Sequence, residues 1–260
     1  MSLRLSQVQF DKWLAHTVER IAGASVRPEP FGNCRMENLL PPDLFANLRG
    51  MDLQAVTMLQ RPPGVAQAER EKNRFYLTVN RRSPKSMNDD APFLVVAFML
   101  LSHPSTVAAL RRLLADQLAA EFGRQDLVFD PSLTLVEDRS GYELLPHTDI
   151  PSKAITLLIY LAGDGDDPRL GTELFWLRDE HWLLKPDIMR LRLGRHLFSR
   201  VETVPYLPNH GLAFVPSQNT FHGVAEVKGS VRRILQYQLS VSAEVAETRR
   251  RRQGGDATAG

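Results

Sequence analysis

Residues 141–151 read GYELLPHTDIP, and this stretch holds the two residues on which the interpretation of the whole chain depends, His147 and Asp149. The stretch lies between two segments of β type and ends at a proline. On an extended backbone, residues i and i+2 point to the same face. The side chains of His147 and Asp149 can therefore reach a single metal ion, whereas Thr148 points away from it.

A third ligand has to come from a distant segment, and His222 is the strongest candidate. It follows an apolar strand and a turn in residues 211–224, GLAFVPSQNTFHGV, and precedes another long strand. Two imidazoles and one carboxylate form the facial ligand set that holds Fe(II) and leaves the opposite face open. The other histidines have no partner ligand at metal spacing, so we expect structural roles for them. They are His16, His103, His181, His196 and His210.

Two arginines begin the last long strand, and their faces differ. Arg232 shares a face with an isoleucine and two glutamines, which suits a polar cavity. Arg233 shares a face with two leucines and a tyrosine, which suits packing against helices. A guanidinium fork matches a carboxylate bidentately, so an arginine here would hold a dicarboxylate co-substrate. We assign this role to Arg232, with Arg233 as the alternative.

The first half of the chain favours helices. Apolar residues recur at helical spacing and turn residues mark the ends. The apolar run 91–101 fits either a buried strand or a core helix and is too short to span a bilayer. The helices are expected at residues 4–23, 42–48 and 105–122, with one strand at 75–79 among the polar loops of residues 61–90.

The second half favours short strands separated by turn clusters at 138–141 and 163–168. Strands that follow helices predict a mainly β fold with flanking helices, built on a sandwich or jelly roll. We divide the chain into a helical support region (1–130), the β core (131–243) and a basic tail (244–260) expected to be disordered, with a short helix over residues 243–252 as the alternative. The strands are expected at residues 132–137, 154–162, 172–177, 211–215 and 231–241.

Composition narrows the function classes. The net charge is +2, with 24% charged and 43% hydrophobic residues, so neither nucleic acid nor a membrane surface is an expected partner. The single cysteine, Cys34, excludes a zinc site with several cysteines and is expected to be a small core residue. No secretory signal or membrane-spanning run is visible, so we expect a cytoplasmic location.

The stretch from residue 141 to residue 241 resembles the catalytic core of the iron(II)/2-oxoglutarate-dependent oxygenases, nearest in pattern to their prolyl-hydroxylase-like branch. That family has a His-x-Asp pair, a distal histidine and a basic residue about ten positions later, matched here by His147, Asp149, His222 and Arg232. The segment 170–175, LGTELF, resembles the family's glycine-led strand. The chain departs from the family pattern at position 234, where isoleucine stands in place of a frequent serine.

The resemblance implies a double-stranded β-helix, the cupin-like jelly roll, with Fe(II) at its mouth bound by His147, Asp149 and His222. It implies that 2-oxoglutarate and O2 are consumed and that succinate and CO2 are released while an unactivated C–H bond is hydroxylated. Tyr160 falls where the family places a tyrosine on the co-substrate carboxylate, beside Arg232. Thr156 and Leu158 would line the same face as Tyr160.

The substrate and the oligomeric state stay open. A small molecule, a saccharide or a peptidyl residue would each be compatible. The loops of residues 61–90 could form a lid, and Phe175, Trp176 and Trp182 could contact substrate or pack in the core. Two alternatives are a cupin-type metalloenzyme that does not use 2-oxoglutarate and a jelly-roll module that binds a sugar or peptide without catalysis.

Overall fold

The protein is represented by a computed structural model that describes residues 5–52, 73–84, 86–124, 126–179 and 194–255. The helices are α1 (Gln7–Ala22), α2 (Pro42–Arg49), α4 (Met87–Asp90), α5 (Pro92–Leu101), α6 (Pro104–Leu113), α7 (Ala115–Phe122) and α8 (Ala243–Gly255), with short 3-10 turns at Pro168–Leu170 and Arg195–Leu197. The strands are β1 (Val26–Arg27), β2 (Asn33–Met36), β3 (Arg74–Asn80), β4 (Asp130–Arg139), β5 (Leu144–His147), β6 (Lys153–Tyr160), β7 (Thr172–Leu177), β8 (Phe198–Val204), β9 (Gly211–Phe214), β10 (His222–Val224) and β11 (Val231–Ser240).

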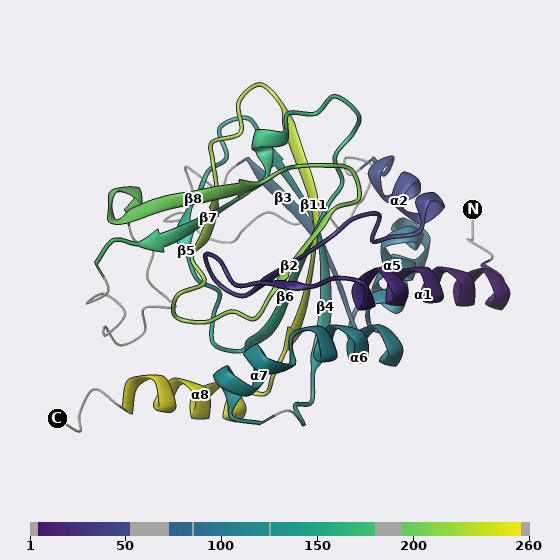
Figure 1. Ribbon diagram of the computed structural model, residues 1–260. Helices are drawn as coiled ribbons and strands as arrows, with labels where there is room; N and C mark the ends of the chain where they lie inside the picture. Colours follow the sequence, from purple (N-terminus) through teal and green to yellow (C-terminus); the bar gives the residue numbers. More distant parts are fainter. Residues whose placement is uncertain (1–4, 53–72, 85, 125, 180–193, 256–260) are drawn as a thin grey trace.

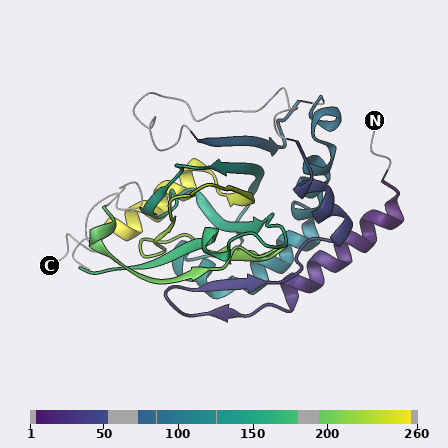
Figure 2. The ribbon, with the colours of Figure 1, turned by 90° about the horizontal axis from the view of Figure 1, so that it is seen from above.

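The strands form two antiparallel sheets (Figure 1). The larger sheet has seven strands in the order β1-β2-β9-β6-β11-β4-β3, and the smaller has four in the order β5-β10-β7-β8. Apolar side chains of both sheets, among them Leu158 and Ile234 from the larger and Leu174 and Val224 from the smaller, share one core. The view from above shows the strand layers stacked against each other (Figure 2). The expected jelly roll with flanking helices is confirmed.

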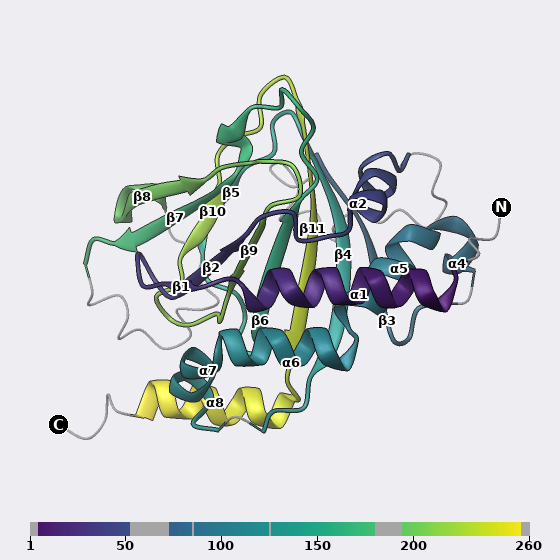
Figure 3. The ribbon, with the colours of Figure 1, turned by 45° about the vertical axis from the view of Figure 1, so that its right-hand side comes forward.

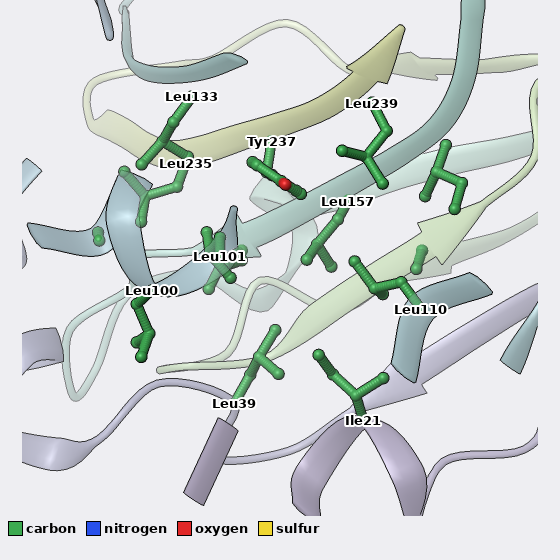
Figure 4. Packing of buried hydrophobic residues seen from close by; sticks show 14 of the residues in the cluster. Ile21, Leu39, Leu100, Leu101, Leu110, Leu133, Leu157, Leu235, Tyr237 and Leu239 are labelled. Carbon is green, nitrogen blue, oxygen red and sulfur yellow. The ribbon is translucent and has the colours of Figure 1, made fainter. Parts of the chain in front are cut away.

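The helices cover the outer face of the larger sheet (Figure 3). A second, larger core lies between the helices and this sheet. Leucines of α5 and α6 meet leucines of β4, β6 and β11 in this layer (Figure 4). Strand β11 contributes to both cores because its side chains alternate. Leu235, Tyr237 and Leu239 pack toward the helices, whereas Ile234 packs between the sheets.

The expected helix at 105–122 is divided into α6 and α7 at Leu114, where φ is −109° and ψ is 22°. It also begins earlier, because Pro104 occupies the first turn, where a missing N–H costs nothing. The Nδ1 atom of His103, rather than Ser105, caps that turn by accepting from the Ser105 backbone N–H at 3.2 Å. The run 91–101 forms helix α5 from Pro92 onward, and its apolar side chains pack among other helices and the sheet, apart from the exposed Met99.

The tail from residue 244 is not disordered but forms helix α8 throughout its described part, which agrees with the alternative of a short helix there. Its order has a physical cause, since Arg249 is buried and forms an ion pair with Glu121 of α7 at 2.7 Å. Strands β1, β2 and β3, which lie in the first half of the chain, are also part of the larger sheet. Cys34 is buried as expected, and burial raises the pKa of its thiol to about 12.

No single helix among the described residues has the length and apolar composition needed to cross a membrane. Helices α5 and α6 meet the composition test only when taken together, and the pair is bent by 55°.

The core between the helices and the larger sheet should contribute strongly to the free energy of unfolding. Replacing Leu157, which is fully buried in β6, by alanine should lower the free energy of unfolding in urea by about 3 kcal/mol, from lost apolar burial and the cavity left behind. Met99 of α5 is 55% exposed, so Met99→Ala is a control that should change the free energy of unfolding by less than about 0.5 kcal/mol. Equal losses in the two variants would contradict this placement of the core.

Candidate metal centre

Two neighbouring strands of the smaller sheet bring the two histidines together. His147 is the last residue of β5, His222 is the first residue of β10, and the antiparallel register pairs them directly. Their ring centroids are 4.5 Å apart. Asp149 follows β5 by two residues and is buried. Ligand atoms of the three side chains all lie within 4.8 Å of one another, as a shared metal ion requires.

Backbone carbonyls set the orientation of both rings. Nδ1 of His147 lies 3.0 Å from the carbonyl oxygen of Leu145, and Nδ1 of His222 lies 3.0 Å from that of Thr220. A carbonyl oxygen only accepts, so each Nδ1 carries the proton and donates it. Each Nε2 therefore keeps its lone pair for a metal. The edge-to-face contact of Phe214 with the His222 ring, at 5.0 Å between centroids, further fixes that ring.

The strand β10 can lie between β5 and β7 because its second residue is glycine. A Cβ atom on Gly223 would come within 2.6 Å of the carbonyl oxygen of Leu144 in β5. No side chain could be accommodated there without moving backbone. Gly223 thus permits the close pairing that places His222 opposite His147.

The carboxylate of Asp149 is held at both oxygens. Thr156 of β6 donates its hydroxyl to Oδ2 at 2.7 Å, and Lys153 donates from Nζ to Oδ1 at 2.5 Å. Thr156 was expected on the cavity face, whereas Lys153 was not singled out in the sequence. The available signal was a lysine four residues after the aspartate, at the start of a mostly apolar strand.

The electrostatics of the site favour the protonation states that a metal needs. Burial lowers the pKa of His147 to about 3, and the nearby His222 adds to this effect. Burial likewise lowers the pKa of His222. For Asp149, burial alone would raise the pKa, but Lys153 and the two imidazoles outweigh it and hold the pKa below its ordinary value. At neutral pH the site thus presents two neutral imidazoles and one carboxylate.

A cavity of about 350 Å³ opens over these three residues between the sheets, and Arg232 also lines it. Arg232 is only 1% exposed. Its Nε donates to the carbonyl oxygen of Leu170 at 2.6 Å and its Nη1 donates to Asp138 at 2.7 Å. Arg74 of β3 lines the cavity as well, with its Nε 3.3 Å from Asp138, so two guanidinium groups share one buried carboxylate here.

Unlike Arg232, Arg233 and Tyr160 do not line this cavity. Arg233 is on the opposite face of β11, where it pairs with Glu137 at 2.7 Å and borders a separate depression. Tyr160 is buried and donates its hydroxyl to Thr172 at 2.8 Å, and it is Thr172 that lines the cavity. Burial raises the pKa of Tyr160. The structure therefore brings Arg232 to the cavity, keeps Arg233 away from it, and places Tyr160 one residue removed from its wall.

The wall formed by the larger sheet is polar along one row. Thr78, Thr134 and Gln236 are cross-strand neighbours on β3, β4 and β11, and all three line the cavity. The two threonine hydroxyls are 3.0 Å apart. Gln238 lines the cavity next along β11. The two glutamines were expected on this face, whereas the threonines were not singled out in the sequence.

The remaining candidates lie away from the cavity or outside the described residues. Phe175 packs with Phe198 and Phe221 in a small cluster, and Trp176 is half-exposed with its ring N–H donated to the Pro30 carbonyl at 3.2 Å. His181, Trp182 and residues 61–72 of the expected lid lie outside the described residues. In the part of the chain that is described, His16, His103, His196 and His210 join no cluster of metal ligands.

Several known structures are similar to this one at low sequence identity. A prolyl 4-hydroxylase of Phytophthora capsici matches with a TM-score of 0.54 and 14% identity, over 93% of this chain and 68% of that one. A Pseudomonas putida prolyl-4-hydroxylase matches with a TM-score of 0.49 and 16% identity, over 88% and 99%. The epimerase SnoN, in complex with Fe3+, alpha-ketoglutarate and nogalamycin RO, matches with a TM-score of 0.49 and 16% identity, over 91% and 85%.

The fold assignment rests on the first of these structures, and it confirms at the level of fold the resemblance inferred from the sequence. No protein-family model matches the chain, and no curated protein matches it in sequence.

The lowered imidazole pKa values predict how Co(II) binding depends on pH. A histidine with a lowered pKa stays neutral until the pH approaches that lower value, so protons compete with the metal only in stronger acid. Lowering the pH from about 7.5 to about 5.5 should weaken Co(II) binding by less than about fivefold, whereas two imidazoles with a pKa of about 6.5 would lose roughly 100-fold.

The visible absorption of bound Co(II) measures this affinity, and His222→Ala serves as the control that should abolish high-affinity binding. If the wild-type protein instead lost roughly 100-fold in Co(II) affinity over this pH range, the two imidazoles would be ordinary, solvated groups.

Proposed function

We propose that the protein is an Fe(II)/2-oxoglutarate-dependent oxygenase that hydroxylates a C–H bond of its substrate. One observation carries the proposal. A single cavity is lined both by a His-Asp-His cluster of metal ligands and by the buried side chain of Arg232. A metal and a carboxylate-binding group in one cavity are what a chelating keto acid with a second carboxylate needs.

The metal would be held by Nε2 of His147, Nε2 of His222 and the carboxylate of Asp149. The donor set fits Fe(II), because both rings have their Nδ1 atoms engaged and the carboxylate is oriented by Thr156. When bound, Fe(II) would use O2 and 2-oxoglutarate to oxidise a C–H bond, with succinate and CO2 as co-products. The protein's part is to fix the ligands and exclude water.

The far carboxylate of 2-oxoglutarate would bind Arg232. The Nε and Nη1 atoms of Arg232 are engaged by Leu170 and Asp138, which fixes the plane of the guanidinium. Arg232 lines the cavity, and its Nη2 atom would be the donor to the co-substrate. Arg74 adds positive charge at the same end of the cavity. Tyr160 would act through the hydroxyl of Thr172 rather than on the co-substrate directly.

The substrate would lie over the polar row formed by Thr78, Thr134 and Gln236, with Gln238 beside it. Hydroxyl and amide side chains in a cavity recognise groups that form hydrogen bonds, because leaving them unpaired on binding would cost free energy. This favours a substrate rich in hydroxyl or amide groups, such as a saccharide or a peptidyl residue, over a purely apolar one. The fold shared with a prolyl 4-hydroxylase supports an oxidative reaction.

The contact between Arg232 and Asp138 favours one alternative. Because an internal carboxylate already pairs with this arginine, the site could be that of a metalloenzyme of cupin type that needs no dicarboxylate co-substrate. The two functions differ in a measurable way, since only the first requires Arg232 for binding of 2-oxoglutarate.

An anaerobic titration of the Fe(II)-loaded protein with 2-oxoglutarate should produce a visible metal-to-ligand charge-transfer band. Arg232→Lys keeps a charge beside Asp138 but loses the fork, so it should raise the dissociation constant of 2-oxoglutarate at least about tenfold while Fe(II) binding persists. Arg233→Lys is the matched control on the opposite face and should leave the dissociation constant within about twofold.

An iron-loaded, folded wild-type protein without the band would overturn the co-substrate assignment and favour the cupin-type alternative. Equal effects of the two lysine variants would overturn the assignment of Arg232.

A further inference from the structure

The last described helix, α8, carries an arginine, Arg249, that is buried and fully hydrogen-bonded. Arg249 of α8 is only 1% exposed. A guanidinium has five N–H donors, and that of Arg249 makes five hydrogen bonds, all to oxygen atoms of three other segments. A charged group is buried at tolerable cost only when it is paired and its donors are satisfied. Because every donor has a partner, the guanidinium of Arg249 is held in one position.

One edge of this guanidinium holds the segment that carries the carboxylate ligand. Nη1 of Arg249 donates to the carbonyl oxygens of Pro151 and Lys153, each at 3.0 Å. These residues lie two and four positions after Asp149, and the Lys153 side chain donates to the Asp149 carboxylate at 2.5 Å. Arg249 thus fixes the backbone of the turn from which Asp149 and its lysine partner project.

The same guanidinium holds the segment that leads to the distal histidine. Nη2 of Arg249 donates to the carbonyl oxygen of Pro216. The turn that follows is closed by the Thr220 hydroxyl, which accepts from the Ser217 backbone N–H at 2.8 Å. The Thr220 carbonyl in turn accepts from Nδ1 of His222 at 3.0 Å. A short path of hydrogen bonds therefore joins Arg249 to the orientation of the second imidazole.

Helix α7 holds the guanidinium from the other side. Glu121 accepts from Nε at 3.2 Å and from Nη2 at 2.7 Å, and the guanidinium carbon lies 4.4 Å from the centre of the Phe122 ring. Burial lowers the pKa of Arg249, and the Glu121 carboxylate opposes that effect. Helices α7 and α8 lie side by side below the sheets (Figures 1 and 3). The two helices thus present one fixed donor group to both ligand-bearing segments.

We propose that Arg249 is a positioning residue that preorganises the metal centre by holding the Asp149 turn and the Pro216–His222 turn at a fixed separation. This inference rests on the proposed metal-binding function of the three ligands. A lysine could not substitute, because its three donors lack the planar fork that reaches three segments at once.

The test is a titration of the full-length protein with Co(II), followed by the visible absorption of the bound metal. Arg249→Met should weaken Co(II) binding at least about tenfold and alter the band, because partners that orient metal ligands contribute roughly 10–100-fold to affinity. Arg251→Met is the matched control on the same helix, since Arg251 is 79% exposed and bonds to Glu247. It should leave Co(II) affinity within about twofold.

A rescue experiment separates positioning from general stability. Ethylguanidinium added to Arg249→Ala should restore Co(II) affinity toward the wild-type value, whereas ethylammonium at the same concentration should not, because only the former has the planar fork. Should Arg249→Met fail to fold, Arg249→Lys keeps a charge beside Glu121 and takes its place, with the same expected loss of affinity.

Unchanged Co(II) affinity and band in a folded Arg249→Met or Arg249→Lys protein would overturn the inference while leaving the proposed function intact. Failure of the wild-type protein itself to bind Co(II) would overturn the metal centre, and the inference with it.

Discussion

The pairing of β5 with β10 is the constraint on which the candidate site depends. In antiparallel register, the last residue of β5 faces the first residue of β10, and these are the two histidines. A slip of one residue would turn one of the imidazoles to the other face of the sheet. Gly223 permits this close pairing, and the segment after β5 is free to turn so that Asp149 joins the two rings. Three ligands from two distant segments thus become one cluster.

The two faces of the larger sheet have different roles: the outer face packs in the core, and the inner face lines the cavity. Its outer face is covered by helices and is almost entirely apolar, whereas its inner face changes from apolar to polar where it lines the cavity. Strand β11 shows this division within one segment, because alternate residues face opposite layers. Arg232 and Gln236 face the cavity, while Leu235 and Leu239 pack against the helices. The chain can therefore keep buried polar groups in the cavity without interrupting the core that stabilises the fold.

Much of this arrangement is predictable from sequence because it depends on local patterns. The strand at 172–177 was predicted at its observed bounds, and the alternation along β11 correctly distinguished the faces of Arg232 and Arg233. The spacing of His147 and Asp149 follows from the period of an extended chain.

Other features depend on contacts that no local pattern contains. Asp138 was assigned to a turn, yet it lies in β4, where its strand partner is Arg232. Helix α8 has a weakly amphipathic, highly basic sequence, and its order depends on a partner, Glu121, on another helix far away in the chain. The role of Lys153 likewise appears only when the turn after Asp149 is folded, because four residues along an irregular segment define no face.

In the proposed function, one cavity holds both a metal and a dicarboxylate. A crystal structure of the protein grown with Mn(II) and 2-oxoglutarate, with anomalous diffraction data to locate the metal, tests it most directly. We expect one metal peak among His147, Asp149 and His222, with the keto-acid end of 2-oxoglutarate on the metal and its far carboxylate on Arg232. A metal bound elsewhere, or an ordered metal with Arg232 paired only to Asp138 and no 2-oxoglutarate in the cavity, would contradict it.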